Sequence, residues 1–118
     1  MSYMLLIVEP VGQRAERSIE EGHRVYDRMI GFTESLKKRG VLKASESLGT
    51  PARRLRKGGR QAEVDVVDGP FAEAKEMVGG FFLLDCASEA EALAIAAECP
   101  AAEWCTIEIR KVAPCYDY

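Results

Sequence analysis

Two segments that are apolar at nearly every position constrain what this chain can fold into. The first covers residues 3–8 and reads Tyr-Met-Leu-Leu-Ile-Val, and the second covers residues 81–86 and reads Phe-Phe-Leu-Leu-Asp-Cys. A strand with one face in water alternates apolar and polar residues, whereas a strand covered on both faces is apolar almost throughout. Both segments are therefore predicted to be central strands of a sheet.

A helix is predicted after each of these strands, because each is followed by a capping box. In Ser18–Glu21 and in Ser88–Glu91, the serine and the glutamate can satisfy each other's free backbone N–H groups and start a helix. Gly40 suits the left-handed residue that closes the first helix, and Pro100 marks the end of the second. The residues expected to face inward are Val25, Met29, Phe32 and Leu36 in the first helix and Ala90, Leu93 and Ala97 in the second.

The remaining elements are two strands and a hairpin. Residues 41–48 and 106–112 read as strands, and residues 55–66 read as a hairpin about the turn pair Gly58-Gly59. The order is β-α-β, a hairpin, then β-α-β. It predicts one α+β domain over residues 1–118, with a ferredoxin-like split βαβ antiparallel sheet and an inserted β-hairpin.

The two apolar strands also predict a homodimer. Two helices cover only one face of a four-stranded sheet, so the apolar residues of the opposite face need another surface to pack against. A second copy of the chain is the simplest partner, because it offers the same apolar face.

Composition excludes several classes of protein. The chain has 118 residues, is 47% hydrophobic and carries a net charge of -3, which is typical of a globular domain and gives no reason to expect nucleic acid as a partner. The apolar N-terminal run ends at Glu9-Pro10, too short for a membrane span and without a signal-peptide pattern, so we expect a cytoplasmic protein with no membrane partner. The four cysteines form no C-x-x-C pair, so no metal site and no cofactor are expected. Because thiols stay reduced in the cytoplasm, the cysteines are expected to be free thiols.

Residues 68–76 read Asp-Gly-Pro-Phe-Ala-Glu-Ala-Lys-Glu and are followed by Gly79-Gly80-Phe81. This stretch resembles the signature of the DGPF-domain branch of the YCII-related family. Further matches are residues 3–7, 32–42, 46–48 and 107–110. The resemblance implies a ferredoxin-like fold that pairs its sheets into a dimeric α+β barrel. Most similar members are uncharacterised, and some are encoded next to sigma factors of the extracytoplasmic-function type.

The wider YCII-related group includes a dehydrochlorinase that acts on chlorinated hydroxyquinols, and a His-Asp pair has been proposed as the active site of such relatives. The only histidine of this chain, His23, lies several residues before the family position. With Asp27 it forms a local pair four residues apart on one helix face. A solvated helix face explains the same pair, since it lies off the apolar stripe.

A cluster of charged residues gives the main candidate site. Asp68, Glu73, Lys75 and Glu76 follow a strand end, and Glu46 lies in the strand predicted over residues 41–48. If they converge on a cleft, a carboxylate could move a proton while Lys75 orients an anionic or phenolic substrate. Turn formation is the alternative for Asp68, and exposure on an edge strand is the alternative for Glu46.

Two hypotheses of function follow. The first is a cofactor-free enzyme or binding protein for an unknown small molecule, catalysing proton transfer, elimination or hydrolysis, with Asp68, Glu46 and Lys75 as participants. The second is a non-enzymatic accessory or regulatory protein, linked to a sigma factor, that binds a protein partner through the basic hairpin or an exposed helix. The basic residues are Arg53, Arg54, Arg56, Lys57 and Arg60, which equally suit a solvated hairpin that discourages edge pairing.

Overall fold

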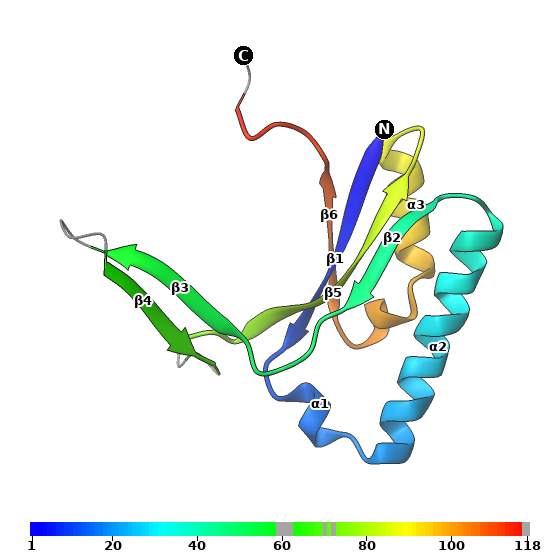
Figure 1. The fold of residues 1–118 in the computed structure, drawn as a ribbon. Coiled ribbons are helices and arrows are strands. Elements are labelled where there is room, and N and C mark those ends of the chain that lie inside the picture. The colour runs from blue at the N-terminus through cyan, green and yellow to red at the C-terminus, as the bar shows by residue number, and fades with distance from the viewer. Residues whose placement is uncertain (59–62, 70, 72, 117–118) are drawn as a thin grey trace.

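The computed structural model describes residues 1–58, 63–69, 71 and 73–116 and has an α+β fold (Figure 1). A four-stranded antiparallel sheet has the strand order β2-β5-β1-β6, and β3 and β4 form a separate two-stranded sheet. The elements in chain order are β1 (Ser2–Pro10), α1 (Gln13–Glu16), α2 (Ile19–Lys38), β2 (Leu42–Ser47), β3 (Arg53–Gly58), β4 (Glu63–Asp68), β5 (Glu76–Asp85), α3 (Glu89–Glu98), the short 3₁₀-helix η1 (Pro100–Glu103) and β6 (Thr106–Lys111).

The two strands predicted to be central, β1 and β5, occupy the middle of the four-stranded sheet, which confirms that prediction. Alternate residues of each strand point to opposite faces. On the face covered by α2 and α3, the residues of β1 and β5 are buried, whereas those on the other face are partly exposed. The buried set is Tyr3, Leu5, Ile7, Phe82 and Leu84, and the partly exposed set is Met4, Leu6, Val8, Phe81 and Leu83.

The hydrophobic core lies between the helices and this covered face. Its largest fully buried side chains are Leu5, Leu36, Leu84 and Ile95. Phe32 of α2 packs edge-on against Phe82 of β5, with ring centres 5.2 Å apart. Such aromatic pairs and the burial of large apolar side chains supply most of the stabilising free energy of a domain this size. The core therefore holds the C-terminal half of α2 firmly on the sheet.

Both long helices begin with the serine cap of the predicted capping box, but the described residues do not show the reciprocal bond from the serine N–H to the glutamate; Glu91 Oε2 accepts from the Ala87 N–H instead, at 2.8 Å. Ser18 Oγ accepts a hydrogen bond from the Glu21 backbone N–H at 3.1 Å, and Ser88 Oγ accepts one from the Glu91 N–H at 3.2 Å. Gly40 has φ of 71°, the left-handed conformation expected at the end of α2. The helix starts and the end of α2 are thus fixed by local sequence.

The buried face of α3 differs from the prediction. Ala90, Leu93 and Ala97 were expected to face inward, but all three are exposed and Leu93 is 50% exposed. The buried residues are instead Ala92, Ile95 and Ala96. Apolar residues surround this helix on nearly every side, so their spacing does not fix which face turns inward. Packing of the large Ile95 against the sheet decides the orientation.

The β3–β4 hairpin stands away from the rest of the molecule (Figure 1). The pairing of Leu55 with Val66 confirms the predicted hairpin, while Gly59 of its predicted turn and Arg60 lie outside the described residues. The radius of gyration is 16.7 Å, above the roughly 13.5 Å expected for a compact chain of this length. Large apolar side chains remain exposed on this arm, namely Leu55, Val64, Val66 and Val67.

Candidate functional site

A cleft of about 560 Å³ lies between α2 and the helix-covered face of the sheet, at the end where β1 finishes. The N-terminal half of α2 forms one wall through residues spaced three or four apart, which share one face of a helix. These α2 residues are Gly22, Val25, Tyr26, Met29, Ile30 and Thr33. Opposite them are Ile7 and Phe82 of the sheet, and residues of α1 and η1 line the lower end.

An ion pair between the buried Glu9 and the more exposed Arg14 supports the floor of this cleft. Glu9, at the end of β1, is only 5% exposed. Arg14 of α1 donates from Nε to Oε2 at 3.0 Å and from Nη2 to Oε1 at 2.6 Å, so both carboxylate oxygens are engaged. The same guanidinium donates to the backbone oxygens of Leu48 at 2.8 Å and Gly79 at 3.1 Å. One side chain therefore fixes the ends of β1, β2 and β5 relative to one another.

The glycine pair of β5 makes room for this arrangement. A Cβ atom on Gly79 would lie 1.6 Å from Glu9 Oε1 and 2.9 Å from Arg14 Nη2. A Cβ atom on Gly80 would lie 2.9 Å from the backbone oxygen of Glu46, because β2 approaches closely there. The Gly79-Gly80 pair is thus required by the buried carboxylate and by strand pairing.

The lower wall of the cleft joins α1 to the segment after η1. Gln13 Nε2 donates to the Trp104 backbone oxygen at 2.7 Å, and Cys105 Sγ donates to Gln13 Oε1 at 3.6 Å. The guanidinium carbons of Arg17 and Arg28 lie 5.7 Å and 5.3 Å from the centre of the Trp104 ring, within the range of cation–π attraction. These contacts hold the short helix α1 in place against the cleft.

The thiol of Cys105 is protonated at neutral pH. Its pKa is raised to about 11, chiefly by burial and also by the nearby Glu9 carboxylate, against the lowering effect of the Arg17 and Arg14 cations. A thiolate is the nucleophilic form of cysteine. Cys105 therefore contributes a neutral, weakly polar surface to the cleft rather than a nucleophile.

The structure separates the residues of the predicted charged cluster. Glu46 lines the cleft at its β2 edge, but its register opposite Phe81 places its exposed side chain on the face away from the helices. Asp68 is exposed on β4 and forms an ion pair with Arg53, Nε to Oδ1 at 2.6 Å. Glu76 lines a second cavity of about 600 Å³, between α1 and the β3–β4 hairpin. Their catalytic roles stay a prediction.

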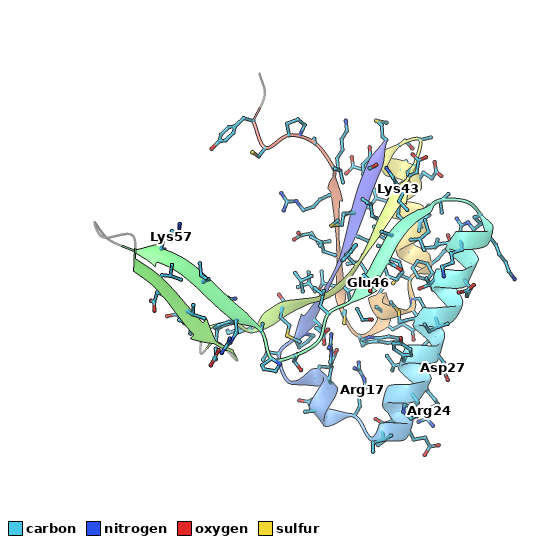
Figure 2. The ribbon with its side chains drawn as sticks, viewed as in Figure 1. Arg17, Arg24, Asp27, Lys43, Glu46 and Lys57 are labelled. Atoms are coloured by element: carbon cyan, nitrogen blue, oxygen red, sulfur yellow. The ribbon has the colours of Figure 1, made fainter. Side chains whose placement is uncertain are left out.

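Three further residues of the predicted sites, Lys75, His23 and Asp27, line neither cavity. Lys75 is exposed just before β5, where its backbone oxygen accepts a hydrogen bond from the Val11 N–H at 2.9 Å. His23 and Asp27 are both exposed on α2, outside the stripe that faces the cleft. Figure 2 shows Asp27 on the outer side of that helix. Pro70 and Ala72 of the Asp-Gly-Pro-Phe-Ala motif lie outside the described residues.

Sequence reasoning missed Glu9, Arg14, Arg17 and Trp104 as cleft residues. One signal was available for Glu9, since it continues the alternation of Tyr3, Leu5 and Ile7 and so falls on the buried face. A carboxylate at such a position needs a cation nearby.

Among the described residues, no three His, Cys, Asp or Glu side chains are placed to hold a metal ion. No helix in the same part of the chain is long and apolar enough to cross a membrane.

The fold and the cleft define a class of small α+β proteins with a ligand-sized space between a helix and an antiparallel sheet. Residues 1–115 match the model of the YCII-related domain, and the chain belongs to that family. A segment of 31 residues is 64% identical to a protein of Rhizobium meliloti (strain 1021) that is itself described as uncharacterized. That match covers 26% of this chain and 25% of the relative, so it spans about a quarter of the relative's length.

We predict that Gly79→Ala lowers the free energy of unfolding by about 1–3 kcal/mol, the usual cost of overpacking. The new methyl group would displace a carboxylate that is buried and bonded through both oxygens. Urea unfolding measures the change. Gly31→Ala is the matched control, because its Cβ meets nothing within 4 Å on α2 and should raise stability by about 0.5–1 kcal/mol. Equal stability of Gly79→Ala and the wild type would contradict the packing described here.

We also predict that Cys105 resists alkylation until the pH approaches its pKa. With a pKa of about 11, only about one thiol in a thousand is ionised at pH 8, so the rate with iodoacetamide should rise roughly tenfold per unit between pH 8 and pH 10. Tandem mass spectrometry gives the rate at each cysteine. Cys115, which is exposed, serves as the internal reference. Labelling of Cys105 as fast as that of Cys115 at pH 8 would contradict its burial in the cleft.

Proposed function

We propose that the protein binds a small organic molecule in the cleft between α2 and the sheet, as a cofactor-free enzyme or a binding protein. The observation that carries this proposal is the cleft itself. Its volume of about 560 Å³ falls within the roughly 300–1,000 Å³ of small-molecule sites. Apolar side chains form most of its walls, and a few fixed polar groups, including Gln13 and Arg17, point to a ligand with a polar end.

Two features of the cleft bear on catalysis. Glu9 has both oxygens engaged by Arg14, and Cys105 is a neutral thiol, so neither is free to take a proton from a ligand. Glu46, the other carboxylate residue of the lining, has its side chain on the opposite face of the sheet. Binding is therefore better supported than turnover.

We also propose that this chain is a cytoplasmic member of the DGPF branch, with a ferredoxin-like fold paired into a dimeric α+β barrel. The Asp68–Glu76 motif supports the branch. The strand order β2-β5-β1-β6 supports the topology. The partly exposed apolar side chains on the face away from the helices support a second copy as their cover, as do the exposed side chains of the hairpin arm.

The cleft is tested by filling it. Gly22 lies in the cleft-facing stripe of α2, and a Cβ there meets nothing within 4 Å. We predict that Gly22→Leu abolishes the stabilisation by any ligand found in a thermal-shift screen of phenols, quinols and small acids. Because glycine is unfavourable inside a helix, the variant itself should be about 0.5–1 kcal/mol more stable than the wild type.

Gly31→Leu is the control for this experiment, because Gly31 lies on the exposed side of the same helix with nothing within 4 Å of its Cβ. It should gain the same stability and keep the ligand response. A ligand whose effect survives in Gly22→Leu does not bind in the cleft. A flat screen with wild-type protein would favour an accessory role.

The dimer is tested by light scattering. We predict a mass of twice the 13.0 kDa of the chain at micromolar concentration, and the monomer mass for Leu6→Glu. Leu6 lies between Phe81 and Glu108 on the face away from the helices, so a glutamate there remains hydrated in the monomer but opposes pairing of two sheets. A monomeric wild type would overturn the dimer and leave the cleft unaffected.

A specific observation favours the accessory role as the second candidate. The hairpin arm projects from the fold (Figure 1). It combines exposed apolar side chains with basic ones. Arg53 is paired with Asp68, and the Arg54 guanidinium stacks 3.9 Å from the centre of the Phe71 ring. Among the side chains that the structure describes, which leave out that of Glu63, no carboxylate lies within 4.0 Å of Arg56 or Lys57, and we propose these two cations as the contacts of an acidic protein surface.

A further inference from the structure

Arg17 is a cation of the cleft that has no counter-ion among the described side chains. Glu9 and Arg14 neutralise each other, and Glu46 has its side chain on the other face of the sheet. Among the residues that the structure describes, no carboxylate oxygen lies within 4.0 Å of the Arg17 guanidinium. Arg17 is nevertheless partly buried. A charge that is partly withdrawn from water gains free energy when an anion is placed beside it.

Two contacts bear on the position of Arg17, namely the attachment of α1, which it follows, and the Trp104 ring, which its guanidinium lies over. It follows α1, which Arg14 and Gln13 attach to the sheet and to Trp104. The Trp104 ring attracts both Arg17 and Arg28, but Arg28 is already neutralised by its ion pair with Glu103. Figure 2 shows Arg17 between α1 and α2, below the end of the sheet. Its guanidinium is therefore an unneutralised cation held at one end of the cleft.

The rest of the lining is mainly apolar. The wall of α2 presents Val25, Met29 and Ile30, and the sheet presents Ile7 and Phe82. A ligand that fits both parts has an apolar body and one anionic end. A guanidinium forms two parallel hydrogen bonds with a carboxylate, so one arginine suffices for that group. A phosphate site normally adds backbone N–H groups of a glycine-rich turn, whereas the lining glycines Gly79 and Gly80 lie within β5 and Gly22 within α2.

We propose that the cleft takes a small hydrophobic carboxylic acid, with its carboxylate on Arg17 and its apolar body against α2 and the sheet. This inference rests on the proposed function and names the ligand class of the same site. It makes Arg17 the residue that selects acids over neutral molecules of equal shape.

The experiment is calorimetric titration at pH 7 with benzoate, cyclohexanecarboxylate, inorganic phosphate and the neutral isostere benzamide. The proteins are the wild type, Arg17→Gln, Arg24→Gln and Gly22→Leu. Arg24 is the matched control, because it is an exposed arginine of α2 that pairs with Glu20 and lies outside the cleft lining. Arg24→Gln changes the net charge of the chain by the same amount as Arg17→Gln.

We expect the wild type and Arg24→Gln to bind the two acids roughly tenfold to a hundredfold more tightly than benzamide, the range for a hydrogen bond to a charged group. Arg17→Gln should lose that preference while still binding benzamide, and Gly22→Leu should bind none of the probes. Equal binding of benzoate and benzamide by the wild type would overturn the inference and leave the proposed function standing.

Three other results would also count against the inference. Preference for acids that persists in Arg17→Gln would remove Arg17 from the site. Phosphate bound more tightly than benzoate would replace the carboxylate by a phosphate ligand. No binding of any probe at millimolar concentration, together with a flat thermal-shift screen, would overturn the proposed function as well.

Discussion

A carboxylate buried at the end of a central strand is tolerated only when a cation meets it with good geometry. Glu9 satisfies this condition through Arg14, which occupies both of its oxygens. Because the same guanidinium also bonds the backbone at Leu48 and Gly79, the pair sets the relative positions of three strand ends. The cleft forms where the sheet is held at this end while α2 diverges from it.

Arg14 also links two spaces that would otherwise be separate. It lines the cleft beneath α2 and the second cavity beside the hairpin. Because its side chain belongs to the walls of both, a shift of the Arg14 guanidinium would alter both cavities at once. The ion pair therefore supports the walls of the site, although it takes no direct part in the proposed binding of a ligand or in proton transfer.

The sequence predicts those parts of the fold that depend on local patterns. The apolar runs of β1 and β5 identify central strands, and the capping serines and Gly40 fix helix boundaries, because each of these signals acts within a few residues. The inward face of α3 could not be predicted, since alanine and leucine surround that helix and only contact with the sheet selects Ala92, Ile95 and Ala96. The YCII-related family was predicted from the chain and is confirmed by the match over residues 1–115.

The cleft was less accessible to prediction than the fold. The cleft combines residues that are far apart in the sequence, namely Arg14, Arg17 and Trp104. They meet because α1 contacts a segment 91 residues away, as the Gln13–Trp104 hydrogen bond shows. No spacing along the chain encodes such an encounter. The predicted residues Asp68 and Lys75 belong to a recognisable motif, but a motif specifies a family more directly than it specifies which side chains line a cavity.

The hairpin arm has a consequence for how stability is distributed in the molecule. A two-stranded hairpin that packs against little else is only marginally stable by itself. Its backbone amides should therefore exchange with solvent through local opening, at a lower free energy than that of global unfolding. A surface that covers the arm would suppress this local opening, so that recognition of the hairpin and the ordering of β3 and β4 would be a single event.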